Sequence, residues 1–114
     1  MGTSFSKNRF EYLEKNRHNH QAILALFDEY DIDVSGKLEG PELANFVEEL
    51  TQYLYQSKFQ PKNIKITFSD IRTLIYNTVE QNHDGKFDRS EICNNIDKIF
   101  TVVDKYIGLH SFST

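Results

Sequence analysis

Two short acidic segments carry the residues of this chain that could do chemistry. The segments Asp31–Glu42 and Glu80–Glu91 hold eight of the 17 acidic residues in a chain of 114 residues. Each segment has a glycine at its centre, Gly36 or Gly85, and ends on a glutamate. Clustered carboxylates repel one another unless a cation neutralises them, and carboxylate oxygens are the ligands that a hard cation prefers. The two segments therefore predict two binding sites for a divalent cation.

The first segment, DIDVSGKLEGPE, offers oxygen donors at alternate residues and resembles the Ca²⁺-binding loop of the EF-hand family. Gly36, at loop position 6, permits the sharp turn that brings the following residues round. The resemblance implies side-chain ligands from Asp31, Asp33, Ser35, Glu39 (directly or through water) and Glu42 (through both oxygens), and a backbone carbonyl ligand from Lys37.

Apolar residues surround this loop at the spacing that the EF-hand family uses. The residues eight, five, four and one before the loop, and the same distances after it, are all apolar: Ile23, Leu26, Phe27, Tyr30, Leu43, Phe46, Val47 and Leu50. An acidic surface loop between two ordinary helices is the alternative interpretation. That alternative does not explain why the loop residues, the central glycine and the apolar flanks all fall at EF-hand positions, so we favour an EF-hand.

The second segment, EQNHDGKFDRSE, matches the same pattern less completely. Its predicted Ca²⁺ ligands are Glu80, Asn82, Asp84, Lys86 (backbone carbonyl) and Glu91. Six of the eight flanking positions are apolar, namely Ile75, Tyr76, Val79, Ile92, Ile96 and Ile99; Arg72 and Asn95 occupy the other two. The family prefers Asp at position 1, where this loop has Glu80. The extra methylene of Glu80 pushes its carboxylate into the space that the ion would occupy. We therefore expect the first loop to bind Ca²⁺ more tightly; the alternative is that the second hand only completes the pair.

The predicted fold is all-α: an EF-hand pair, which is two helix-loop-helix units with a short β-bridge between their loops. Leu38 and Phe87 hold the same place in their loops and are expected to meet in that bridge. Thr67 or Ser69 is expected to cap the third helix of the pair, and the last helix is expected to fray near Gly108. The ranges are a tail or short helix over 1–18, the EF-hand pair over 19–107 (hand one 19–54, linker 55–67, hand two 68–107) and a tail over 108–114.

The linker is longer than in calmodulin-like pairs and is similar to that of calbindin, calretinin and secretagogin. The abundance of Asn, Lys, Ile, Phe and Tyr also resembles that of four-EF-hand calcium-binding proteins of the ciliate cell cortex. The latter resemblance implies that the chain is one half of a longer protein. We expect a cytoplasmic protein, with the cell cortex or a membrane as places where it could associate, the membrane only if Gly2 is acylated.

Composition and motifs argue against several other classes. The formal net charge of −4 argues against general binding to nucleic acids. We find no nucleophile–base arrangement and no phosphate-binding glycine loop, so we expect no enzyme. The four histidines and Cys93 do not have zinc-site spacing. Residues 1–6 fit the N-myristoylation pattern, so contact with a membrane is expected only if Gly2 is acylated.

Two functions of different class follow from the EF-hand resemblance. A calcium sensor would open on binding Ca²⁺ and engage a protein partner, either a helix or a cytoskeletal target. A calcium buffer or a calcium-stabilised structural module would open little. Sensor grooves are often rich in methionine, whereas the one methionine here is Met1, so we expect a dedicated partner rather than a promiscuous groove.

Overall fold

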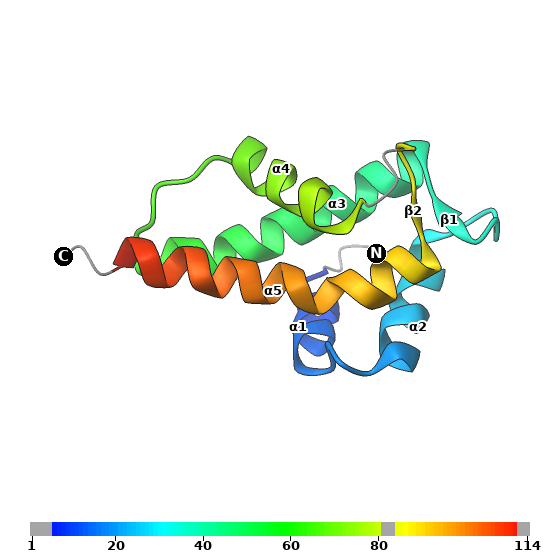
Figure 1. Ribbon diagram of the computed structural model, residues 1–114, viewed down its shortest axis with the longest axis horizontal. Coiled ribbons are helices and arrows are strands. Elements are labelled where there is room, and N and C mark those ends of the chain that lie inside the picture. Colours follow the sequence, from blue (N-terminus) through cyan, green and yellow to red (C-terminus); the bar gives the residue numbers. More distant parts are fainter. Residues whose placement is uncertain (1–5, 81–83, 112–114) are drawn as a thin grey trace.

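The chain folds as an all-α EF-hand pair with a short antiparallel β-bridge (Figure 1). The computed structural model describes residues 6–80 and 84–111. In chain order its elements are α1 Ser6–Lys15, α2 His20–Tyr30, β1 Lys37–Leu38, α3 Gly40–Leu54, the π-helical turn η1 Tyr55–Phe59, the 3₁₀ turn η2 Gln60–Lys62, α4 Phe68–Val79, β2 Phe87–Asp88 and α5 Arg89–Ser111. Among the described residues, no helix combines the length and apolarity that crossing a bilayer requires.

The first hand consists of α2, the acidic loop and α3. Asn19 caps α2 by accepting hydrogen bonds from the backbone N–H groups of Gln21 and Ala22. Pro41 lies in the first turn of α3, where a missing N–H leaves no hydrogen bond unmade. All eight apolar flanking residues of this loop are buried, which confirms the interpretation of the sequence spacing: Ile23, Leu26, Phe27, Tyr30, Leu43, Phe46, Val47 and Leu50.

The second hand consists of α4, the second loop and α5. Thr67 and Asp70 form a capping box at the start of α4, as one of the two predicted caps required. Strands β1 and β2 join the two loops in antiparallel register, with Leu38 opposite Phe87 and Lys37 opposite Asp88. Leu38 and Phe87 are both fully buried. The predicted contact between loop positions 8 is therefore confirmed.

The segment between the hands differs from the irregular linker expected after Leu54. The helical path continues from α3 through η1 and η2 and ends at Asn63, which adopts a left-handed conformation. Phe59 holds this path in place, because it is fully buried and its ring lies 5.7 Å from that of Tyr106 in α5. Pro61 interrupts no hydrogen bond, since it lies in the first turn of η2.

The last helix also exceeds its expected length. α5 continues through Gly108 to Ser111 instead of fraying at the glycine. The ring of Tyr106 against Phe59, and the packing of Ile107 on the core, hold the turn that precedes Gly108. A glycine inside a helix is less favourable than alanine by about 1 kcal/mol, which such packing readily offsets.

Helix α1 packs on the EF-hand pair and contributes to the same core. It lies beside α2 and beneath α5 in the view of Figure 1. Phe10 is fully buried and Leu13 is almost fully buried, and both belong to the single apolar cluster that runs through the two hands. The segment expected to be a tail or short helix over 1–18 thus contains a helix, Ser6–Lys15, that is an integral part of the described fold.

Candidate metal centre

The first loop brings three carboxylates together. One oxygen from each of Asp31, Asp33 and Glu42 can be chosen so that all three lie within 4.8 Å of one another. Asp31 ends α2, Asp33 lies in the loop and Glu42 lies in the first turn of α3. The helix–loop–helix path therefore folds back so that ligands eleven residues apart in sequence reach one point.

Backbone amides orient the carboxylate of Asp31. Its Oδ2 accepts a hydrogen bond of 2.8 Å from the N–H of Gly36, and its Oδ1 accepts one of 3.1 Å from the N–H of Ser35. Desolvation raises the pKa of Asp31, but these hydrogen bonds outweigh it, so the pKa lies below its ordinary value. Gly36 reaches this position at φ +85°, a conformation that glycine adopts without strain. The carboxylate is thus ionised and held in place by the turn.

Glu42 closes the loop from the far side. Its Oε2 accepts a hydrogen bond of 3.0 Å from the N–H of Asp33. Its Oε1 is buried, and among the described residues it has no hydrogen-bond partner. A buried carboxylate oxygen without a partner is unfavourable, so Oε1 is suited to an additional ligand such as a cation.

Ser35 and Lys37 lie within the same turn. The Ser35 hydroxyl lies 3.1 Å from the Lys37 carbonyl oxygen and 3.3 Å from Asp31 Oδ1. The Lys37 side chain is exposed. The hydroxyl and carbonyl oxygens predicted as ligands therefore gather on the side of the loop where Asp31 lies.

This donor set fits a hard divalent cation. Ca²⁺ takes six to eight oxygen ligands in flexible geometry, whereas Mg²⁺ demands near-octahedral coordination. The first loop offers three carboxylates, one hydroxyl and one backbone carbonyl. One of the carboxylate oxygens, Glu42 Oε1, has no hydrogen-bond partner among the described residues. The residues that would hold Ca²⁺ are Asp31, Asp33, Ser35, Lys37 and Glu42.

The second loop repeats part of this arrangement. Glu80 accepts a hydrogen bond from the N–H of Gly85, the same contact between positions 1 and 6 that Asp31 makes with Gly36. Gly85 has φ +76°, matching the left-handed conformation of Gly36. Asp84 accepts from the N–H of Lys86 at 3.0 Å. Asn82, a predicted ligand, lies outside the described residues.

Glu91 and Asp88 form a reciprocal cap at the start of α5. Glu91 Oε1 accepts from the Asp88 N–H at 3.1 Å, and Asp88 Oδ1 accepts from the Glu91 N–H at 2.8 Å. Glu91 is 6% exposed. At least one oxygen of the last predicted ligand therefore stabilises the helix that begins there.

Two ion pairs around the first loop were not anticipated from the sequence. Lys86 Nζ lies 3.4 Å from Glu39 Oε1, which links position 7 of one loop to position 9 of the other. Arg89 Nη1 lies 2.7 Å from Asp28 Oδ1, and the guanidinium carbon of Arg89 lies 5.4 Å from the centroid of the Phe27 ring. Only the register of the β-bridge could have indicated the first pair, since it places the two loops side by side.

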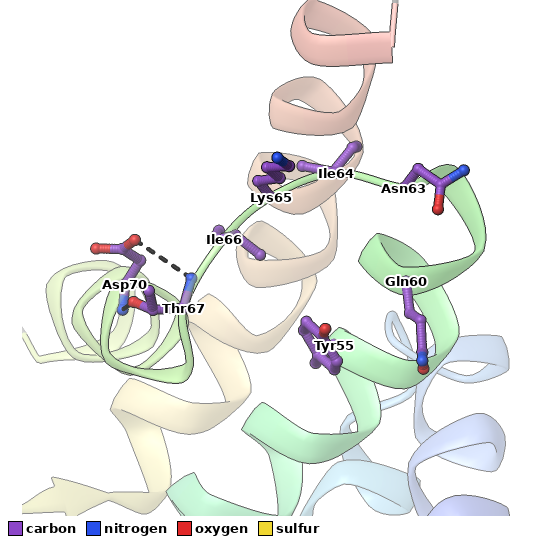
Figure 2. A pocket seen from close by; sticks show the side chains of 8 residues that line it. All are labelled: Tyr55, Gln60, Asn63, Ile64, Lys65, Ile66, Thr67 and Asp70. Carbon is purple, nitrogen blue, oxygen red and sulfur yellow. Dashed lines mark hydrogen bonds between the residues drawn. The ribbon is translucent and has the colours of Figure 1, made fainter.

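A pocket at the far end of the molecule carries different chemistry. It has a volume of about 740 Å³ and lies between η2 and the start of α4 (Figure 2). Its one carboxylate, Asp70, is engaged in the capping box with Thr67, drawn as a dashed line in Figure 2. The pocket therefore lacks the converging oxygens of the first loop.

Cys93 and the described histidine side chains suggest no second kind of metal centre. Cys93 is half-buried, and burial raises the pKa of its thiol, which disfavours the reactive thiolate. His18 and His20 are exposed, and His18 Nε2 lies 3.5 Å from an oxygen of Asp97. His83 lies outside the described residues.

Comparison with known proteins supports an EF-hand relationship over part of the chain. The chain is 30% identical to secretagogin of Xenopus laevis over 67 residues, which are 59% of this chain. The matched stretch covers 23% of secretagogin, so the chain spans less than a quarter of that protein. No family model matches the chain, and no solved structure matches it. Secretagogin is an EF-hand protein, so the similarity supports the EF-hand interpretation of the matched part of the chain.

Proposed function

We propose that this chain is a calcium-binding module that acts as a calcium sensor. The observation that carries the proposal is the convergence of Asp31, Asp33 and Glu42 within 4.8 Å in a loop paired to a second acidic loop. The similarity to secretagogin supports calcium binding by analogy. The five residues of the first loop are the proposed primary site, and Glu80, Asn82, Asp84, Lys86 and Glu91 are the proposed second site.

The chain's own residues supply the link between binding and shape. Glu42 lies in the first turn of α3 and Asp31 ends α2, so drawing their carboxylates onto one ion moves the end of one helix relative to the other. The β-bridge carries such a movement to the second hand, because Leu38 and Phe87 are packed within one core. An opened pair would expose part of that core to a partner helix.

Calorimetric titration with Ca²⁺ tests the binding proposal. We expect binding at two sites, the tighter with a dissociation constant of about 10⁻⁷ to 10⁻⁵ M. A ligand that binds only the folded state stabilises it by about 2.7 kcal/mol at 100 times its dissociation constant, so the melting temperature should rise with Ca²⁺ and rise less with Mg²⁺. Glu11→Gln, an exposed substitution outside both loops, is the matched control. Identical melting curves in Ca²⁺ and in chelator contradict the proposal.

A calcium buffer or calcium-stabilised structural module is the alternative function. The single methionine argues against an adaptable sensor groove of the promiscuous kind, and a buffer or structural module needs no such groove. A dye that fluoresces on exposed apolar surface separates the two functions. We expect a several-fold rise in dye fluorescence when Ca²⁺ is added to a sensor, whereas unchanged fluorescence with intact Ca²⁺ binding indicates a buffer.

The partner and the location belong to the same proposal. We propose a helical or cytoskeletal protein partner, no catalytic activity and no binding to nucleic acid. We propose a cytoplasmic location, at the cell cortex or at a membrane, with membrane contact depending on acylation of Gly2. The resemblance in composition to ciliate cortical proteins stays a prediction.

A further inference from the structure

Helix α1 lies outside both hands in sequence but packs against both helices of the first hand. The ring of Phe10 lies 6.4 Å from Tyr30 of α2, 6.0 Å from Phe46 of α3 and 6.0 Å from Tyr53 of α3, measured between ring centroids. Phe10 is fully buried in this aromatic cluster, and Leu13 follows one helical turn later at 1% exposed. The apolar face of α1 therefore packs on a surface that α2 and α3 form together, with Tyr30, Phe46 and Tyr53 at its centre; we call this surface the seat.

Polar contacts on either side of Phe10 attach α1 to the same two helices. Arg9 Nη1 donates a hydrogen bond of 2.9 Å to the Tyr30 hydroxyl, and Arg9 lies 3.2 Å from Glu29 and 3.6 Å from Glu49. The Tyr30 hydroxyl in turn donates to Glu49. Arg9 thus contacts the last turn of α2 and the middle of α3 with a single guanidinium group.

The other end of α1 is attached to α3 and the turn that follows it. Glu14 accepts a hydrogen bond of 2.8 Å from the Tyr53 hydroxyl and forms an ion pair with Lys58 of η1. Just beyond α1, Arg17 lies 3.0 Å from Asp97 of α5. The seat therefore has an acidic end at Glu29 and Glu49 and a basic end at Lys58, and α1 matches both with residues of opposite charge.

We propose that α1 is the internal occupant of a helix-docking surface, and that a partner helix of the same chemistry replaces it when metal binding loosens the first hand. The surface is the seat of Tyr30, Phe46 and Tyr53 with its two charged ends. The partner helix carries a basic residue beside an aromatic one, an apolar residue three positions later and an acidic residue next to that. This inference rests on the proposed sensor function and names the partner surface of that site.

If a partner helix displaces α1 when the metal binds, docking of α1 and binding of the metal must oppose each other. Because α1 contacts α2 and α3 at once, it docks most tightly at one angle between the axes of these two helices. A change in that angle breaks the contacts of α1 with one of them. A ligand that favours a different angle therefore weakens α1 docking, and by thermodynamic reciprocity a docked α1 weakens that ligand. A helix with a purely structural role in the core would instead support the metal site.

The test is whether weaker docking of α1 raises or lowers the affinity for Ca²⁺. In the full chain we expect Phe10→Ala to raise Ca²⁺ affinity about fivefold or more, measured by calorimetry, while it lowers the melting temperature in chelator. Tyr12→Ala is the matched control, because Tyr12 lies on the same helix and is 58% exposed; we expect it to change neither quantity. Unchanged or reduced Ca²⁺ affinity in Phe10→Ala overturns the proposal.

If circular dichroism shows that Phe10→Ala does not fold, a less disruptive substitution, Arg9→Gln, tests the same coupling. Arg9→Gln leaves the core intact and removes the contacts to Glu29 and Glu49, so it should raise Ca²⁺ affinity in the same direction, about twofold. An acetylated peptide of residues 6–15, labelled with a fluorophore, is then offered to the chain in Ca²⁺. We expect the peptide to bind the Arg9→Gln variant at least tenfold more tightly than the wild type. In the wild type, the chain's own α1 competes with the peptide at millimolar effective concentration. Equal binding to both overturns the proposal.

The proposed function and this inference fail in different ways. If the wild-type chain binds no Ca²⁺ in calorimetry, the proposed function is wrong and the inference falls with it. If the wild type binds Ca²⁺ but the variants show no gain in affinity, the metal site stands and α1 is only a part of the core.

Discussion

The two acidic loops share a frame but differ in what their carboxylates do. In both, the residue at position 1 accepts a hydrogen bond from the glycine at position 6, and in both that glycine has a positive φ. In the first loop, Glu42 reaches across to the N–H of Asp33 and keeps Oε1 buried without a described partner. In the second loop, Glu91 forms a reciprocal cap with Asp88.

The difference lies in the residue at position 9. Asp88 is short enough to cap α5 and to pair with Glu91, whereas Glu39 makes no side-chain cap to α3 and lies beside Lys86 instead. The position-12 glutamate of each loop therefore meets a different neighbour. A shared motif thus determines where a carboxylate lies, while residues outside its main ligand positions determine what its oxygens bind.

Removing the buried aromatic group of the bridge should have the largest effect. Phe87→Ala leaves a cavity at the contact between the loops, and large-to-small substitutions of buried Phe cost about 3–5 kcal/mol of unfolding free energy. Urea unfolding in chelator measures this loss. Because β2 pairs with β1, we also expect weaker Ca²⁺ binding at the first loop, followed by NMR at the Gly36 amide. If Gly36 titrates at the wild-type concentration, the loops are not coupled through the bridge.

The next largest effect should separate the two sites. Glu42→Gln removes the negative charge and replaces one carboxylate oxygen with an amide nitrogen, so the side chain can no longer bind the ion through two oxygens. We expect the tighter Ca²⁺ step to be lost, with its affinity falling by about 100-fold. Glu91→Gln is the matched substitution at the same position of the other loop. We expect it to weaken only the second step in calorimetry. If Glu91→Gln removes the tighter step instead, the ranking of the loops is reversed.

Removing the helix cap in the second loop should have a smaller effect than removing a Ca²⁺ ligand. Asp88→Ala removes the side-chain acceptor for the Glu91 N–H, and loss of an N-cap costs about 1 kcal/mol. Glu39→Ala, at the same place in the first loop, removes no cap and should cost less than half of that. Urea unfolding in chelator compares the two variants. Equal losses contradict the assignment of different roles to position 9.

The ion pair between the loops should have the smallest effect. Lys86 and Glu39 are both partly exposed, and pairs of this kind contribute about 0.2–1 kcal/mol, reduced by salt. Removing the positive charge in Lys86→Gln should raise the Ca²⁺ affinity of the first loop about twofold at low salt. The gain should vanish in the background of Glu39→Gln, which makes the test a double-mutant cycle. A gain that persists without Glu39 assigns the effect to another charge.

The sequence predicted those features that rest on regular spacing. Helical periodicity identified the buried flanks, and equal loop numbering identified the contact between Leu38 and Phe87. It could not predict contacts that depend on how helices meet. Arg9 and Glu14 belong to a segment expected only to be a tail or short helix, yet both pair with the first hand. Val34 adopts φ +54°, a conformation that a β-branched residue rarely takes and that no spacing indicates.

The turn η1 makes the helix after the first hand one residue longer than its core contacts need. Leu54 and Phe59 are five residues apart, a spacing that would place them about 140° apart around an α-helix, yet both are fully buried. The wider π turn, closed by the Gln60 N–H on the Tyr55 carbonyl, brings them to the same side. Deleting the exposed Gln56 would restore α-helical spacing and keep both side chains inward. This turn is therefore a place where the length of the chain, rather than the type of residue, is free to vary.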